Sequence, residues 1–391
     1  MSVGRAHSAG PTRRRLLAAF GAGLLGTAVP AASRAQRGAP PIAVGAIRWD
    51  AWQSPGSATT RAVERSLSPA RHRHRLPFFA QVGPGGAVTI DGGTQEVMDT
   101  EIALARRAGL DFWGFLAYPR ESPMSAGLKL YLASERRNGL RFCILSELVQ
   151  WGSAGDAMSQ AAEWHIELLR HPDYQRVAGG RPLYFLGFLS DALVAERWGG
   201  VAALRAAVER FRARAIAADA GDPYIVLMAR PEAAARFVPA LGADAAGAYA
   251  IAGSDRAAPY ASLAGLAERR WDDYAAAGLP VVPTVMSGWD RRPRIENPVP
   301  WEHWQRPGAG IDRYYEAPTP EELAAHLRRA LDWIEAHPRQ AAARAALIYA
   351  WNENDEGGWL VPTLPFDDAR IDAVRGVLCA PARGAVPDGC H

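Results

Sequence analysis

Two glutamates near the end of the chain, Glu353 and Glu356, have the residue type and the spacing for joint acid–base chemistry. They lie in Ala345–Leu360 (AALIYAWNENDEGGWL), where an apolar run with strand character breaks into acids and amides and then into Gly357-Gly358. A buried strand that ends in acids and a glycine turn is typical of an active-site rim. Two carboxyls around one small volume can cleave a glycosidic bond, because one exchanges a proton while the other acts from the opposite side. The spacing alone is equally compatible with a solvated acidic loop.

The strand before these acids sets the direction in which they are expected to point. Regular alternation gives two faces: Leu347, Tyr349, Trp351 and Glu353 on one, and Ile348, Ala350 and Asn352 on the other. Glu353 is then expected at the mouth of whatever the strand lines. The glycine turn can fold Glu356 back beside it.

Eight strands, each after the first preceded by a helix, are expected to position this stretch. The expected strands are Ile42–Trp49, Asp111–Tyr118, Arg141–Leu148, Pro182–Phe188, Tyr224–Met228, Ala243–Ala250, Pro280–Met286 and the strand that begins at Ala345. The expected helices are Thr94–Ala108, Ala126–Asn138, Ala157–Arg170, Val201–Ala218, Pro231–Leu241, Ala261–Ala277 and one that Thr319 opens.

Continuous apolar strands that alternate with amphipathic helices indicate a parallel sheet. Eight of them predict an α/β fold, a (β/α)8 TIM barrel, with long loops after strands one and seven. The first of these loops, 51–93, is expected to carry a strand of its own at Leu76–Val82. A doubly wound open sheet fits less well, because no glycine-rich phosphate turn follows any strand.

In such a barrel the chemistry gathers at the carboxyl ends of the strands. Acids, tyrosines and tryptophans dominate there, and flat aromatic faces suit the C–H faces of sugar rings. The predicted substrate contacts are Trp49, Asp50, Tyr118, Glu147, Tyr249, Trp289, Asp290, Arg294, Trp351 and Asn352. We expect no cofactor and no metal, because His72 and His74 have no acidic or cysteine companion and are better explained as an exposed basic run.

The first 35 residues have the form of a twin-arginine signal peptide. Thr12–Leu17 (TRRRLL) precedes a charge-free stretch rich in Ala and Gly, and Ser33-Arg34-Ala35 offers a small-x-Ala cleavage site. A membrane anchor is the alternative, but the stretch is at the short limit for spanning a bilayer. We therefore expect the Tat export machinery as a partner, a periplasmic or secreted product, and no stable membrane anchor. Residues 36–391 are expected to form a single barrel, with 376–391 as a C-terminal tail.

Charge and cysteine usage limit the other function classes. The formal charge of +3 includes the basic leader, and the scattered arginines have matching acids, so no nucleic-acid partner is expected. Lys129 is the only lysine and falls in an expected helix, which argues against a Schiff-base mechanism. Cys379 and Cys390 can form a disulfide in an oxidising compartment, although two unpaired thiols remain the alternative. Cys143 falls in an apolar strand and is expected to be buried.

Several stretches together resemble one family, the endo-α-mannosidase-like glycoside hydrolases of family 99 and their WbsX-like relatives from polysaccharide loci. They stand in family order and cover most of the chain after the leader: Gly109–Tyr118 (GLDFWGFLAY), His171–Phe185 (HPDYQRVAGGRPLYF), Ala243–Tyr249 (ADAAGAY), Val285–Arg294 (VMSGWDRRPR) and Ala350–Leu360 (AWNENDEGGWL). The last two are the most specific.

The resemblance implies a role for each glutamate, because the family has two glutamates three residues apart in its last motif. Glu353 is then the base that draws a proton from the sugar's 2-hydroxyl, so that this oxygen attacks the anomeric carbon. Glu356 is the acid that protonates the leaving oxygen and then activates water, with retention of configuration. Tyr249 is similar to an active-site tyrosine of the family. The chain departs from the family at Asn354, where an aromatic is usual, and at Ser146-Glu147, where Asn-Glu is usual.

The sequence thus predicts an exported, retaining glycoside hydrolase that acts on α-linked polysaccharide, mannan-like or another bacterial polymer. Two alternatives remain. One is a carbohydrate-binding barrel without turnover, and the other is a WbsX-like glycosyl-transfer protein of polysaccharide biosynthesis. Export argues against glycosyl transfer, because nucleotide sugars are cytoplasmic and the sequence shows no phosphate cradle.

Overall fold

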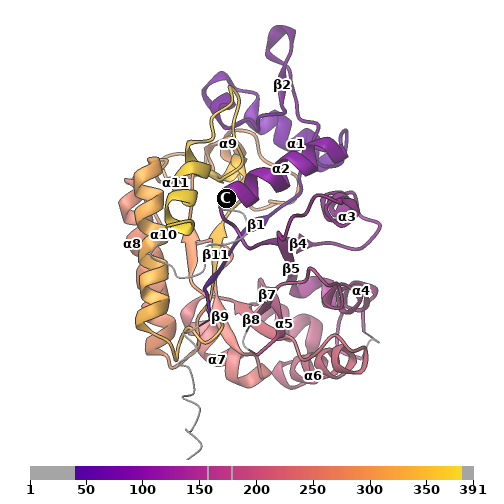
Figure 1. The fold of residues 1–391 in the computed structure, drawn as a ribbon. Coiled ribbons are helices and arrows are strands. Elements are labelled where there is room, and N and C mark those ends of the chain that lie inside the picture. Colours follow the sequence, from indigo (N-terminus) through magenta and orange to yellow (C-terminus); the bar gives the residue numbers. More distant parts are fainter. Residues whose placement is uncertain (1–39, 156–157, 178, 381–391) are drawn as a thin grey trace, which may run out of the picture. The chain divides into compact units, whose positions relative to one another are not determined.

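Parallel strands form a closed ring in the computed structural model, which describes residues 40–155, 158–177 and 179–380 (Figure 1). The ring strands are β1 (Ala43–Arg48), β4 (Phe112–Ala117), β5 (Arg141–Glu147), β7 (Arg181–Gly187), β8 (Tyr224–Met228), β9 (Ala245–Gly247), β10 (Thr284–Met286) and β11 (Ala345–Tyr349). Hydrogen bonds join them in the order β10-β11-β1-β4-β5-β7-β8-β9. The ring closes just before β10, because Ala246 N–H donates to the Pro280 carbonyl at 2.8 Å and Val282 N–H donates to the Ala246 carbonyl at 2.9 Å. The predicted (β/α)8 barrel is confirmed.

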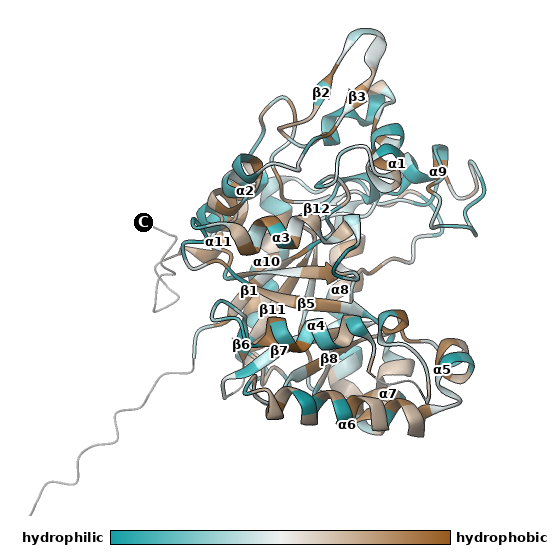
Figure 2. Ribbon diagram, turned by 90° about the vertical axis from the view of Figure 1, so that its right-hand side faces the viewer, coloured by the Kyte–Doolittle hydropathy of each residue, from teal (hydrophilic) through white to brown (hydrophobic). Residues whose placement is uncertain are grey.

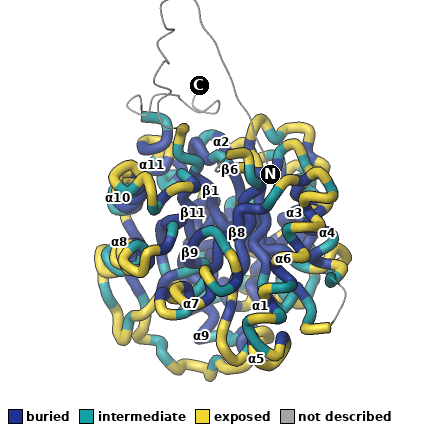
Figure 3. The backbone as a smooth tube through the Cα atoms, turned by 90° about the horizontal axis from the view of Figure 1, so that it is seen from below, coloured by how far each residue is buried: buried dark blue, intermediate teal, exposed yellow. Residues whose placement is uncertain are grey.

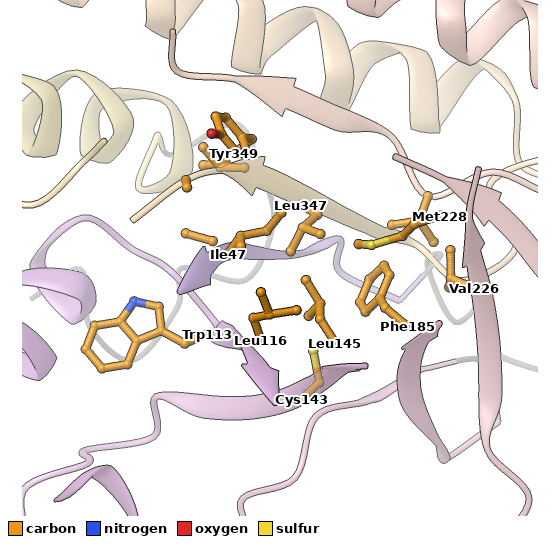
Figure 4. Packing of buried hydrophobic residues seen from close by; sticks show 14 of the residues in the cluster. Ile47, Trp113, Leu116, Cys143, Leu145, Phe185, Val226, Met228, Leu347 and Tyr349 are labelled. Carbon is orange, nitrogen blue, oxygen red and sulfur yellow. The ribbon is translucent and has the colours of Figure 1, made fainter. Parts of the chain in front are cut away.

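The interior of the ring is filled by alternate side chains of each strand. Leu145, Phe185 and Leu347 point inward from three strands, whereas Trp113 points away from them (Figure 4). Gly114 has no side chain at a place where a Cβ would lie 2.5 Å from a Leu145 methyl carbon. The close-packed interior therefore leaves chemistry to the ends of the strands.

Helices surround the ring and bury one side against it. They are α2 (Gln95–Arg107), α3 (Ala126–Ala133), α4 (Gln160–Leu169), α5 (Asp191–Trp198), α6 (Val201–Ala217), α7 (Pro231–Leu241), α8 (Tyr260–Ala276), α10 (Pro320–Ala336) and α11 (Ala369–Leu378). Figure 3 shows the buried strands in the middle and exposed outer sides on the helices, and in Figure 2 the central strands are largely hydrophobic. Thr319 and Glu322 form the capping box that the sequence indicates at the start of α10.

The loop after β1 is an insertion with its own elements. It contains α1 (Ala58–Leu67), the 3-10 helices η1 (Ala70–Arg75) and η2 (Pro84–Gly86), and a hairpin of β2 (Gln81–Val82) and β3 (Val88–Thr89). The predicted strand over Leu76–Val82 is therefore wrong for most of its length. The interpretation of His72 as part of an exposed run is also wrong, since its ring is buried and contacts Glu296 at 2.8 Å.

Shorter elements complete the described chain. They are β6 (Arg176–Val177), which pairs with β7, η3 (Pro123–Ser125), η4 (Leu148–Trp151), α9 (Arg292–Glu296), β12 (Asn352–Glu353), η5 (Asn354–Glu356) and β13 (Gly358–Trp359). Residues 376–378, predicted as part of a tail, belong to α11. The predicted leader, 1–35, and residues 381–391 lie outside the described residues. Across the part that the structure describes, no helix is both long enough and apolar enough to cross a membrane.

Candidate active site

A cavity of about 770 Å³ opens at the carboxyl ends of the ring strands. Its walls come from residues that follow nearly every strand, so the whole ring contributes to one site. The lining side chains that matter below are Trp49, Tyr118, Glu147, Phe188, Arg230, Tyr249, Arg270, Tyr274, Trp289, Arg294, Trp301, Glu302, Glu353 and Glu356. The size is within the range of ligand pockets, and the mixture of aromatic rings with a few charged groups is typical of them.

Both predicted glutamates lie on one hairpin that follows β11. β12 and β13 pair antiparallel, with η5 between them, so that the chain reverses within a few residues. Gly357 makes this reversal with φ 87°, and a Cβ there would lie 2.4 Å from the backbone nitrogen of Asp290. No other residue fits that turn without a shift of the loop after β10. The glycine turn that the sequence indicates thus brings Glu353 and Glu356 to the same cavity wall.

Glu353 is buried and holds two hydrogen bonds from neutral and charged donors. The Tyr249 hydroxyl donates to its Oε1 at 2.6 Å, and the Arg294 Nη2 donates to its Oε2 at 3.2 Å. Burial and the neighbouring carboxyl of Glu356 raise the pKa of Glu353 to about 8, against the opposing effect of Arg294. The protonated form of Glu353 is therefore more favoured than it is in an ordinary exposed glutamate.

Glu356 lies beside it in a more positive environment. The Arg294 Nη1 donates to its Oε1 at 2.5 Å, and Arg291 Nε lies 3.2 Å from the same oxygen. The Tyr349 hydroxyl donates to its other oxygen. Burial and the two nearby glutamates raise the pKa of Tyr349 well above the usual value, so its phenol remains a donor. The two glutamates thus differ in environment although they share one wall.

Arg294 is the centre of the charged cluster under the cavity. Its guanidinium, on α9, makes hydrogen bonds with four acids: Glu302, Glu353, Asp355 and Glu356. Asp355 accepts two of them, at 2.7 and 2.9 Å, and is fully buried. Burial alone would lower the pKa of Arg294, but the acids raise it well above its usual value. One fixed positive charge therefore sets the positions of both candidate catalytic carboxyls.

The structure places six of the ten predicted substrate contacts on the cavity: Trp49, Tyr118, Glu147, Tyr249, Trp289 and Arg294. Trp49 Nε1 donates to the Tyr118 hydroxyl at 2.9 Å, which holds both rings against the wall. Burial raises the pKa of Glu147. Burial, and then Glu353, raise the pKa of Tyr249 well above its usual value, so its hydroxyl stays protonated.

The other four, Asp50, Asp290, Trp351 and Asn352, do not line the cavity, in contrast to the prediction. Asp50 pairs with the buried Arg48 at 2.6 Å on the outer side of the ring. Trp351 turns to that side too, where its Nε1 donates to Glu101 at 2.8 Å, because the regular strand ends at Tyr349 and alternation ends with it.

Asn352 and Asp290 hold loops together. Asn352 accepts from the backbone N–H of Trp49 at 2.8 Å and is fully buried. Asp290 binds Arg292 at 2.7 Å and also pairs with Arg75. The Asn352 carbonyl oxygen and the Asp290 carboxylate are therefore occupied by protein groups, whereas the buried Nδ2 of Asn352 has no hydrogen-bond partner among the described residues.

Sequence reasoning did not select Glu302, which lines the cavity, or Tyr349, which is buried behind the wall and donates to Glu356. Tyr349 could have been found, because alternation already places it on the face of Glu353. Glu302 lies in the irregular loop after β10, where no pattern points to it. Phe188 was noted only as a strand end. It is 48% exposed with φ 61°, and its ring lies 5.3 Å from the ring of Tyr249.

The remaining sequence-based expectations concern metals and cysteines. Within the described ranges, no group of three or more His, Cys, Asp or Glu side chains is arranged to hold a metal ion. Cys143 is buried, as expected. The predicted pairing of Cys379 with Cys390 remains a prediction, because Cys390 lies outside the described residues.

The fold is similar to that of a glycoside hydrolase of known structure. The GH99 endo-α-mannosidase from Bacteroides thetaiotaomicron aligns with a TM-score of 0.52 and 14% identity, over 85% of this chain and 95% of that chain. The structure of the same enzyme in complex with bis-tris propane gives a TM-score of 0.50 and 14% identity, over 86% and 95%. No family profile matches the sequence, and no curated protein matches it either. The described chain has the GH99-like barrel fold that its motifs indicate.

Proposed function

We propose that this protein is a glycoside hydrolase whose catalytic pair is Glu353 and Glu356. One observation carries the proposal: both carboxyls line the same aromatic-walled cavity at the carboxyl end of the barrel, held by a single guanidinium. Active sites of this fold lie at that end, and paired carboxyls are the usual machinery for glycosidic bonds. The likeness to an endo-α-mannosidase supports an α-linked polysaccharide as the substrate.

The proposed reaction takes its roles from the resemblance. Glu353 removes the proton from the 2-hydroxyl, and the oxygen left behind attacks the anomeric carbon as the glycosidic bond breaks. Glu356 gives its proton to the leaving oxygen. In the second half Glu356 takes a proton from water, the water oxygen opens the new ring at the anomeric carbon, and Glu353 returns its proton to the 2-oxygen. Two inversions leave the configuration retained.

The site shows what must change before this reaction can start. Burial and the neighbouring Glu356 raise the pKa of Glu353 and so favour its protonated form. The base role requires this proton to pass to Glu356, which can then act as the acid. Tyr249 and Arg294, which both donate to its oxygens, are the groups that stabilise the resulting carboxylate.

The decisive experiment compares the wild type with Glu353→Gln and Glu356→Gln on a panel of α-linked polysaccharides, including α-mannans. Reducing-end release measures the rate, and NMR of early products gives the anomeric configuration. Each variant should lose about a hundredfold or more in rate, because each removes one proton-transfer group. Glu209→Gln is the matched control, since this glutamate is exposed on α6 and, among the described residues, pairs only with Arg205.

Two results would contradict the proposal. Absence of hydrolysis by the wild type across the panel, with glycan binding retained, would leave a carbohydrate-binding barrel without turnover. An inverted product would remove the proposed use of the 2-hydroxyl.

We also propose that the protein is exported, because its leader has the twin-arginine pattern.

A further inference from the structure

Two further arginines line the cavity, on a part of its wall away from Arg294 and its four acids. Arg230 lies two residues after the end of β8 and directly before α7, and Arg270 lies on α8. Both belong to the cavity wall. Tyr274, one helical turn after Arg270, donates its hydroxyl to the backbone carbonyls of Ala229 and, at 3.0 Å, Gly247. This anchor brings α8 against the end of β8, so that both arginines serve one corner of the cavity, which we call the arginine corner.

Neither guanidinium of the arginine corner has an anionic partner. Among the residues that the structure describes, no carboxylate oxygen lies within 4.0 Å of either guanidinium. Burial, and then the charges of Asp273 and Glu232, raise the pKa of the nearby Tyr274. The contrast with the other cavity arginine is complete, because Arg294 contacts four acids. Two positive charges therefore face the cavity without compensation.

The acids of the cavity lie elsewhere on its rim. Glu353, Glu356 and Glu302 are next to β10 and β11, and Glu147 ends β5, beside Tyr118. A ligand in this cavity meets acids at the cleavage point and uncompensated guanidinium groups near β8. Such a distribution attracts an anionic group to one end and repels it from the other.

We propose that the arginine corner is an anionic subsite, and that the substrate is an acidic polysaccharide. The group it takes is a carboxylate, sulfate or phosphate on a sugar near the cleaved bond. Guanidinium binds these planar or tetrahedral anions through paired N–H donors. Arg230 is exposed and Arg270 is half-buried, so both are accessible to a ligand that enters the cavity. This inference rests on the proposed function for the polymer class, but the charge preference is a property of the binding site alone.

The test measures binding, so that turnover does not enter it. All proteins carry Glu356→Gln to stop the reaction. The probes are α-linked polymers in matched pairs: polygalacturonate and its carboxyl-reduced form, sulfated and unsulfated α-mannan, and phosphorylated and dephosphorylated α-mannan. Calorimetry gives the Kd of each at low and at high salt, with Arg230→Gln/Arg270→Gln compared with the parent.

At least one acidic polymer should bind the parent about tenfold or more tightly than its neutral partner, and the preference should weaken in high salt. The double variant should lose that preference and keep its affinity for the neutral partner. The charge-matched control is Arg328→Gln/Arg339→Gln, two exposed arginines outside the cavity wall, which should behave as the parent. The member of the panel that shows the effect identifies carboxylate, sulfate or phosphate.

The inference is overturned if no acidic polymer is preferred, or if the preference survives in Arg230→Gln/Arg270→Gln. Thermal unfolding of the double variant should match the parent within about 2 °C, because neither side chain makes an ion pair that folding depends on. Failure of the proposed hydrolase function looks different. In that case arginine-dependent binding persists, and the protein with Glu356 intact releases no product.

Discussion

Arg294→Gln is the substitution that most directly tests the reading of the charged cluster. It removes the positive charge that contacts all four acids, Glu302, Glu353, Asp355 and Glu356, and Arg294 itself is 4% exposed. Arg291 remains, but it contacts only Glu302 and Glu356 among these four. Breaking a buried ion pair by removing one partner costs about 3–5 kcal/mol in unfolding free energy. With an unfolding entropy of roughly 2.1 cal/mol/K per residue over about 340 residues, this loss of stability lowers Tm by ~4–7 °C.

The loss should depend on pH. Without Arg294 the buried carboxyls hold protons more tightly in the folded state than in the unfolded chain, so stability falls as pH rises above about 4. The difference between wild type and variant should therefore be largest at neutral pH and shrink on acidification. Differential scanning calorimetry at several pH values between 4.5 and 8 measures it. Activity should also fall, because both proposed catalytic carboxyls lose the donor that positions them.

Arg292→Gln is the control for this prediction. It lies on the same short helix, but its side chain is 33% exposed and its pairing with Asp290 is shared with Arg75. Its removal should cost less than about 1 kcal/mol. The reasoning is refuted if Arg294→Gln is as stable as Arg292→Gln at neutral pH, or if its deficit does not shrink at low pH.

Three further predictions follow from single features. If Glu353 is the base and Glu356 the acid, the active pair holds one shared proton, so kcat/KM should fall as pH rises through about 8, where that proton leaves; a rate that keeps rising above this pH would argue against an acid role for Glu356. Gly127→Ala in α3 should lower the unfolding free energy by about 1–3 kcal/mol in urea, because the new Cβ would lie 2.1 Å from an oxygen of buried Asp50. Gly376→Ala in α11, with open space at the Cβ, should be neutral or stabilising by up to about 1 kcal/mol, and equal effects at the two sites would speak against the packing argument. Arg13→Lys/Arg14→Lys should keep the protein in the cytoplasm on cell fractionation, whereas unchanged periplasmic signal would reject the twin-arginine pathway.

The hydrophobic periodicity of the sequence and the residues that end its helices and strands were sufficient to predict the ring of strands. Continuous apolar strands, the helices between them and their number predicted the barrel. Gly109 and Gly278 directly follow the C-caps of α2 and α8 with positive φ, whereas the helix expected over 126–138 ends at Ala133, before Gly139. The insertion after β1 was not predicted in detail. It consists of short elements whose positions depend on contacts with residues far away in the sequence. Arg75 illustrates this, because it is buried against Asp290, more than two hundred residues away.

The residues of the candidate site could be predicted where they lie at the ends of strands, but not where they lie on loops. Glu353 and Glu356 follow from the acids, the glycine turn and the barrel rule. Trp351 was placed on the wrong face, because alternation stops once the strand leaves the ring. Glu302 and Arg270 reach the cavity from a loop and a helix, whose distance from the cavity depends on packing that no local pattern encodes.

The hairpin that carries the proposed catalytic pair is attached to β1, the first strand of the described residues. Trp351 N–H donates to the carbonyl of Ile47 at 2.6 Å, Asn352 accepts from Trp49, and β11 pairs with β1 from Ala43 onward. A chain leaving the ribosome thus exposes nine-tenths of its length, roughly, before the last strand can meet the first. Under the proposed function, enzymatic activity therefore requires that β11 has paired with β1. A chain that lacks β11, or in which the two strands have not paired, should be inactive.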